Sequence, residues 1–141
     1  MKTGKAILLM MFGVMSLTFV PALYIHITKF IVPMYQVRRM VEPVNQATTW
    51  RPVSEILSSG YGNCKDYSLL LMNILGPEKT QMLITQKQGE ATHAAVLVGG
   101  KLVLDPAFRR SATYNNYMRN RKLIRKIDYK NINSYVQRKV L

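Results

Sequence analysis

The N-terminal part of the chain holds a long stretch without charge. Residues 6–25 contain no Asp, Glu, Lys or Arg, and they follow Lys2 and Lys5. About 20 apolar residues span a bilayer as one helix, and no amphipathic face can be drawn on this stretch. We therefore expect residues 1–27 to be an N-terminal transmembrane helix that anchors the chain, with a cleavable signal segment as the alternative.

Two segments follow the expected anchor. Residues 28–45 contain Pro33 and Pro43 and read as a short helical or irregular stalk, which leaves residues 46–141 as one small domain. Basic residues flank the anchor on both sides, so the positive-inside rule does not decide its orientation. We expect a single-pass membrane protein with its domain outside the cytoplasm, in the periplasm, or a secreted domain if the segment is cleaved.

The cysteine count and the composition exclude several classes of protein. A single cysteine rules out an intramolecular disulfide framework, and it rules out a zinc site built on two or more cysteines. The chain carries 20 Lys and Arg against 7 Asp and Glu, but 48% of its residues are hydrophobic. That apolar fraction is too high for a disordered basic tail, so we expect a folded, strongly basic domain.

The clearest helix signals surround the cysteine. Asn63 is a good N-cap residue, and Gly76 with Pro77 ends the helical pattern. The apolar residues at helical spacing are Tyr67, Leu70, Leu71 and Ile74. Cys64 then lies in the first turn, where free amides and the positive end of the helix dipole favour a thiolate. The alternative is that Cys64 is a small buried apolar residue.

Short β-branched and apolar stretches after this helix predict antiparallel strands. They are residues 81–85, 92–98, 101–104 and 123–127, with a closing helix or strand at 132–140. If residues 99–101 form a three-residue loop, Ala95 faces Asp105, and His93 and Asp105 become diagonal neighbours on one face. A two-residue turn at Gly99 and Gly100 would send these two side chains to opposite faces.

Together, Cys64, His93 and Asp105 supply the side chains that thiol catalysis needs. The imidazole takes the thiol proton, the carboxylate holds the ring in the useful tautomer, and the thiolate attacks an acyl carbon. Backbone amides at the start of the Cys64 helix are candidates to stabilise the oxyanion. Taken singly, His93 as a surface residue and Asp105 as a turn former are the simpler interpretations.

Four blocks of sequence resemble the bacterial transglutaminase-like cysteine peptidases, which belong to the papain-like superfamily. The blocks WRPVSEIL, GNCKDY, HAAVLV and LVLD begin at Trp50, Gly62, His93 and Leu102. The resemblance implies an α+β fold in which a Cys-bearing helix packs on an antiparallel sheet. It also implies that Cys64 is the nucleophile, His93 the base and Asp105 the orienting acid.

The chain departs from the family pattern beside the cysteine. Asn63 and Lys65 stand where the family has acids that resemble a calcium site. Because calcium prefers several anionic oxygens, we expect no metal at this position, and we expect no cofactor. Trp50 and Tyr61 are candidates to line the substrate groove, with packing as the alternative for both.

The C-terminal third is strongly basic. Its Lys and Arg residues are Arg109, Arg110, Arg119, Arg121, Lys122, Arg125, Lys126, Lys130, Arg138 and Lys139. For a tethered domain we expect the anionic membrane surface as the partner of this region. Nucleic acid is the less favoured partner, because interleaved tyrosines can stack on bases but no named nucleic-acid motif is present. A plain solvated basic face is the third possibility.

These observations lead to one expected function. We expect a membrane-tethered cysteine peptidase that cleaves peptide or isopeptide amides of a protein substrate through an acyl-enzyme. One alternative is a transglutaminase-like acyl transferase, in which an amine resolves the same intermediate. The other is a non-catalytic, membrane-associated binding module on the same fold.

Overall fold

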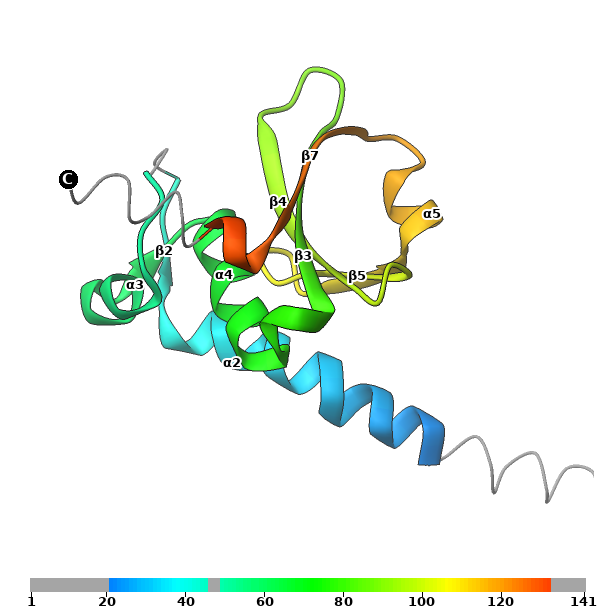
Figure 1. The fold of residues 1–141 in the computed structure, drawn as a ribbon, viewed down its shortest axis with the longest axis horizontal. Coiled ribbons are helices and arrows are strands. Elements are labelled where there is room, and N and C mark those ends of the chain that lie inside the picture. The colour runs from blue at the N-terminus through cyan, green and yellow to red at the C-terminus, as the bar shows by residue number, and fades with distance from the viewer. Residues whose placement is uncertain (1–20, 46–48, 133–141) are drawn as a thin grey trace, which may run out of the picture.

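The computed structural model describes residues 21–45 and 49–132. Within them, five strands form an antiparallel sheet in the order β6-β5-β4-β3-β7 (Figure 1). Their bounds are β3 (Thr80–Gln86), β4 (Thr92–Val98), β5 (Leu102–Asp105), β6 (Arg110–Thr113) and β7 (Lys122–Asp128). The expected α+β class with an antiparallel sheet is confirmed.

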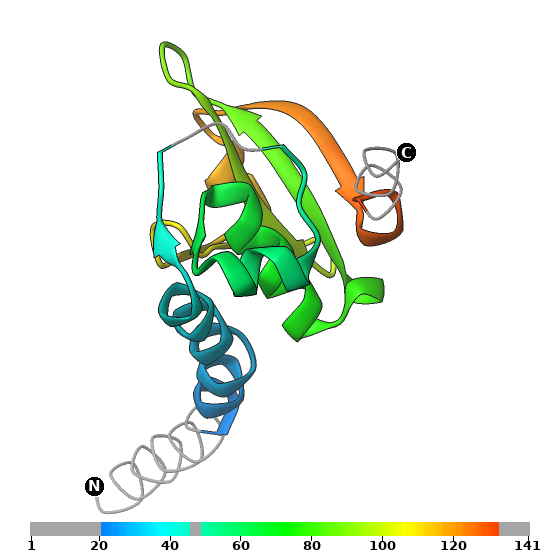
Figure 2. The same cartoon turned by 90° about the vertical axis from the view of Figure 1, so that its left-hand side faces the viewer.

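Helices flank the sheet. They are α2 (Val32–Met40), α3 (Val53–Ser59), α4 (Cys64–Leu75) and α5 (Tyr114–Met118), with a π-helical segment at Ile27–Ile31 and a 3-10 turn at Pro77–Lys79. Helix α4 packs against β4 and β3, and α2 packs against α4. Two short strands, β1 (Glu42–Pro43) and β2 (Tyr61–Gly62), pair in parallel beside α4. Figure 2 shows the helix that includes α2 leading away from the sheet.

Helix α4 is the centre of the core. Its N-cap is Asn63, as predicted, and it ends before Gly76, which has a φ of 105°. The residues from Asp66 to Met72 are buried, so the helix is covered on most sides. Ile74, expected on the buried face, is instead 40% exposed, because it lies in the last turn of the helix.

The segment expected as a stalk contributes to this core. Met34, Val37 and Val41 are buried in the same cluster as the apolar residues of α4. The Tyr67 hydroxyl also donates a hydrogen bond to the Val41 carbonyl at 3.2 Å. Residues 32–41 therefore pack as part of the domain, which begins well before residue 46.

The expected transmembrane helix is corrected by the structure. Across residues 21–45 and 49–132, no helix is long and apolar enough to cross a membrane. The part of the expected span at residues 6–20 lies outside the described residues. The helix that runs on from residue 21 carries Lys29 and Arg38, and its Met34 and Val37 side chains pack in the domain core. Met34 and Val37 thus belong to the domain core, and the expected extracytoplasmic location stays an untested prediction.

The described part of the basic C-terminal third supplies helix α5 and the two opposite edge strands of the sheet, β6 and β7. Tyr114 and Tyr117, considered as base-stacking residues, pack against buried residues on the face of the sheet opposite α4. Lys126 lies over the Tyr114 ring and Arg121 over the Tyr117 ring, at 5.3 and 4.8 Å from the ring centroids. Both rings are therefore occupied within the domain. A membrane surface as the partner of this region is not tested and stays a prediction.

Candidate active site

The start of α4 fixes the position of the only cysteine in the sequence. The Asn63 side chain accepts hydrogen bonds from the amides of Lys65 and Asp66, at 3.0 and 3.2 Å. In return, Asp66 Oδ2 accepts from the Asn63 amide at 3.1 Å, which completes a capping box. Because both ends of this box are satisfied, Cys64 is held as the first residue of the helix.

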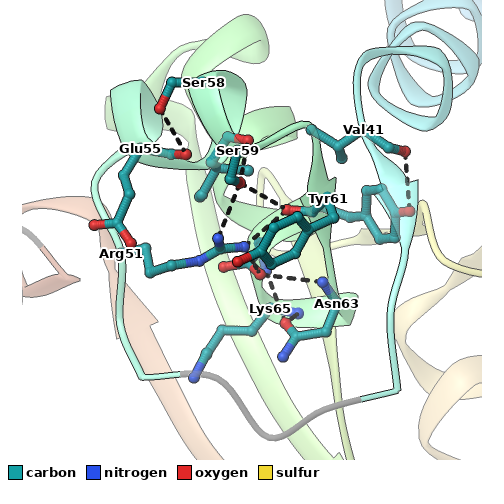
Figure 3. A network of polar contacts seen from close by, with 11 residues as sticks. Val41, Arg51, Glu55, Ser58, Ser59, Tyr61, Asn63 and Lys65 are labelled. Carbon is teal, nitrogen blue, oxygen red and sulfur yellow. Dashed lines mark hydrogen bonds and ion pairs between the residues drawn. The ribbon is translucent and has the colours of Figure 1, made fainter.

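A buried ion pair between Arg51 and Asp66 also stabilises the start of α4. Arg51 Nη2 lies 2.8 Å from Asp66 Oδ2, and the two side chains are 7% and 2% exposed. The guanidinium also donates to Ser59 Oγ at 3.0 Å and to the Tyr61 carbonyl at 2.8 Å (Figure 3). Asp66 therefore both caps the helix and forms an ion pair with Arg51.

The β4–β5 hairpin brings the predicted base and acid together. Val98 pairs with Leu102 and Val96 with Leu104, which is the register of the three-residue loop. Gly99 and Gly100 take φ values of 56° and 71°, a region that glycine enters without strain. His93 Nε2 then lies 2.8 Å from Asp105 Oδ2. The register that thiol catalysis requires is confirmed, and the two-residue turn is excluded.

Asp105 is buried and fixes the orientation of the His93 imidazole. Its side chain is 4% exposed, and its Oδ1 accepts a hydrogen bond from the Phe108 amide at 3.4 Å. The Phe108 ring lies 5.1 Å from the His93 ring, centroid to centroid, and covers it partly from solvent. Because Nε2 of His93 is taken by Asp105, Nδ1 is the ring nitrogen left for the thiol.

The third contact joins His93 to Cys64. The Cys64 thiol lies beside the His93 ring and the Ala94 amide, and both lower its pKa. Strand β5 pairs with β4 only at residues 96–98, so the start of β4 is open on that side, where the thiol lies. The three predicted residues thus form one chain of contacts from Cys64 through His93 to Asp105.

This environment favours the charged forms of both groups. Burial by itself raises the pKa of the Cys64 thiol, but hydrogen bonds from His93 and the Ala94 amide outweigh it and lower that pKa. Burial also disfavours a charged imidazole, yet the hydrogen bonds to Asp105 and Cys64 raise the pKa of His93 to about 9. Both shifts favour the thiolate and the imidazolium, the pair that reacts with acyl groups.

A cleft of about 580 Å³ opens over the sulfur. Its lining comprises residues 43–45, 62–65, 91–94 and 107–108, together with Arg38, Tyr67 and Ile84. Neither Trp50 nor Tyr61 is among these described lining residues. The Trp50 ring lies under the Lys65 ammonium, 4.8 Å from the ring centroid to Nζ, and the Tyr61 ring lies 5.0 Å from the Arg51 guanidinium carbon. Both aromatic rings thus pack against cations that flank the helix start.

Two residues of the site escaped the sequence analysis. Phe108 lies next to His93, but no periodic pattern marks it, because it follows Asp105 in an irregular turn. Arg38 lines the cleft from α2, in the segment expected as a stalk. Only the packing of α2 on α4 brings Arg38 to the cysteine.

The described residues hold no group of three or more His, Cys, Asp or Glu side chains placed to bind a metal ion. Asp66, the acid that remains beside Cys64, is engaged by the Arg51 guanidinium and the Asn63 amide. A cation at this position would have to displace that guanidinium.

The chain was also compared with known proteins. No family model matches it, and neither a curated protein nor a solved structure does. The resemblance to the transglutaminase-like cysteine peptidases therefore rests on its sequence motifs and stays a prediction.

Proposed function

We propose that this protein is a cysteine hydrolase that cleaves amide bonds of peptides or proteins through an acyl-enzyme. One observation carries the proposal: the Cys64 thiol lies beside the hydrogen-bonded His93–Asp105 pair at an open cleft. A thiol with a lowered pKa beside an imidazole–carboxylate pair is typical of a catalytic site. A binding module on the same fold does not require this arrangement.

The reaction follows from the positions of the three groups. The Cys64 thiolate attacks the carbonyl carbon, a C–S bond forms, and the carbonyl oxygen becomes an oxyanion. The His93 imidazolium then gives its proton to the leaving amine, and the C–N bond breaks. Water, deprotonated by the neutral His93, attacks the thioester and releases the acid, which restores the thiolate.

The helix start offers a donor for the oxyanion. The amides of Lys65 and Asp66 are both engaged by the Asn63 side chain. The Cys64 amide has no hydrogen-bond partner among the described residues, and it is adjacent to the reacting sulfur. This amide is therefore the donor that we assign to the oxyanion, at about 10²- to 10³-fold in rate.

Acyl-enzyme formation is the direct test of this proposal. With p-nitrophenyl acetate, we expect a burst of p-nitrophenolate equal to the enzyme concentration and an acetyl group on Cys64 by mass spectrometry. Cys64→Ala should abolish the burst, and Ser54→Ala, at an exposed serine on α3, serves as the control. Acetylation spread over lysines, with no burst that depends on Cys64, would contradict the proposal.

The same experiment separates hydrolysis from acyl transfer. Added glycinamide competes with water for the acetyl-enzyme. The ratio of acetylglycinamide to acetate therefore measures how well an amine reacts in the cleft. Product that stays acetate at high amine concentration supports a hydrolase. Transfer that dominates at millimolar amine would assign the site to acyl transfer instead.

The pH dependence of turnover should be bell-shaped. The pKa of Cys64 is lowered, so the acid limb of the profile lies below the ordinary pKa of a thiol. The pKa of His93 is raised to about 9, so the proton needed by the leaving amine is present at neutral pH and is lost as pH rises through about 9. We expect kcat/KM for a peptide amide to fall above that pH. A rate that keeps rising past pH 10 would contradict this assignment.

A further inference from the structure

Arg38 lines the same cleft as the Cys64 thiol, and its guanidinium stacks on the ring of Tyr67. Its guanidinium carbon lies 4.8 Å from the centroid of the Tyr67 ring. Tyr67 is 1% exposed, and its hydroxyl is held by the Val41 carbonyl. A guanidinium stacked on an immobile ring loses less freedom when it binds a ligand than a solvated side chain does.

The guanidinium of Arg38 has donor capacity to spare. Its Nε is buried and has no hydrogen-bond partner. The ion pairs among the described residues are Arg51–Asp66, Lys87–Glu90 and His93–Asp105, so no described carboxylate neutralises Arg38. Arg38 thus brings to the cleft lining a charge that no described carboxylate balances, and an anionic ligand would balance it.

The described lining of the cleft carries positive charge and no competing acid. Arg38 and Lys65 are its basic residues, and no Asp or Glu is among the described residues that line it. Asp105 lies behind His93, and Asp66 is bound by Arg51. An anion that enters the cleft therefore meets no described carboxylate.

We propose that Arg38 is a specificity residue that binds a carboxylate of the substrate beside the acyl group attacked by Cys64. This inference rests on the proposed thiol chemistry and narrows its substrate class to acidic peptides. The planar guanidinium matches a carboxylate with two parallel hydrogen bonds. The carboxylate belongs either to an acidic side chain or to a free C-terminus, since both present the same chemistry.

Matched alkylating probes test the proposal without a known substrate. Iodoacetyl-glycine against iodoacetyl-glycinamide reports on a terminal carboxylate. The second pair comprises the α-amides of iodoacetyl-glutamate and iodoacetyl-glutamine. Their alkylation rates are compared to test for binding of an acidic side chain. The measured quantity is the ratio of second-order rate constants, acid over amide, for alkylation of Cys64 in the full-length protein at pH 7.

We expect this ratio to be about ten or more for at least one pair in the wild type, and the pair that shows it identifies the source of the carboxylate. Arg38→Gln should bring the ratio close to one. Arg39→Gln removes the same charge from an exposed neighbouring position on α2 and should leave the ratio unchanged. Ratios near one in the wild type, or an equal loss in both variants, would overturn the proposal.

The failure of this inference is distinguishable from failure of the proposed function. If the neutral probes alkylate Cys64 quickly but the acid probes gain nothing, only the role of Arg38 is excluded. If the neutral probes react no faster than with free cysteine, the thiol is not activated and both proposals fail.

Discussion

Replacing Asp105 by Ala should lower the rate of acyl-enzyme formation about 10²- to 10⁴-fold while leaving Cys64 in place. The carboxylate fixes His93 through Nε2 at 2.8 Å and holds its pKa up to about 9. Without it, the imidazole loses both its orientation and the charge that stabilises its protonated form. The alkaline limb of the pH profile should then move down towards 6.5, the ordinary value for histidine.

This shift of the pH profile separates an orienting acid from a residue that only supports the fold. Asp128→Ala is the matched control, because Asp128 also ends a strand and accepts a side-chain hydrogen bond, from Gln81 Nε2 at 2.8 Å. We expect that control to keep both the rate and the alkaline limb. An Asp105→Ala protein with the wild-type profile would remove Asp105 from the mechanism.

Replacing Arg51 by Ala should lower the free energy of unfolding by about 3–5 kcal/mol. The change leaves the Asp66 carboxylate, 2% exposed, without its ion-pair partner, and it removes the donors to Ser59 and the Tyr61 carbonyl. The cost arises mainly from the uncompensated buried charge. Urea unfolding followed by circular dichroism measures it.

A double-mutant cycle isolates the ion pair from the other contacts of Arg51. If the buried charge causes the loss, Asp66→Asn should cost much less in the Arg51→Ala background than in the wild type. Arg39→Ala, an exposed cation on α2, should stay within about 0.5 kcal/mol of the wild type. An Arg51→Ala protein that is equally stable would show that Asp66 needs no partner.

Local signals in the sequence were sufficient for the parts of the site that local chemistry determines. Asn63 caps α4, and Gly76 ends it, because each residue has a backbone or side-chain property that acts within one turn. The two glycines after Val98 predict a turn between β4 and β5, but only the strand pairing decides between the two registers that the sequence left open. The placement of all three predicted residues of the triad follows from these two local structures and the packing of α4 on β4.

Contacts between distant segments were not predictable in the same way. Asp66 pairs with Arg51, fifteen positions away, and no local pattern in the sequence links these two residues. The uncharged stretch predicted a membrane helix at residues 1–27, and two prolines predicted a stalk at residues 28–45. The structure instead uses Met34 and Val37 to bury one side of α4, and this tertiary packing is what brings Arg38 to the cleft.

The central claim is that Cys64 and His93 form a thiolate–imidazolium pair. The most direct measurement is the pH dependence of Cys64 alkylation by iodoacetamide, in the wild type and in His93→Ala. The account predicts fast alkylation of the wild type near pH ~6, and a shift of the reactive range in the variant towards about 8.5, the value of a free thiol. Alkylation that follows a pKa of about 8.5 in both proteins, or an unreactive thiol in both, would contradict it.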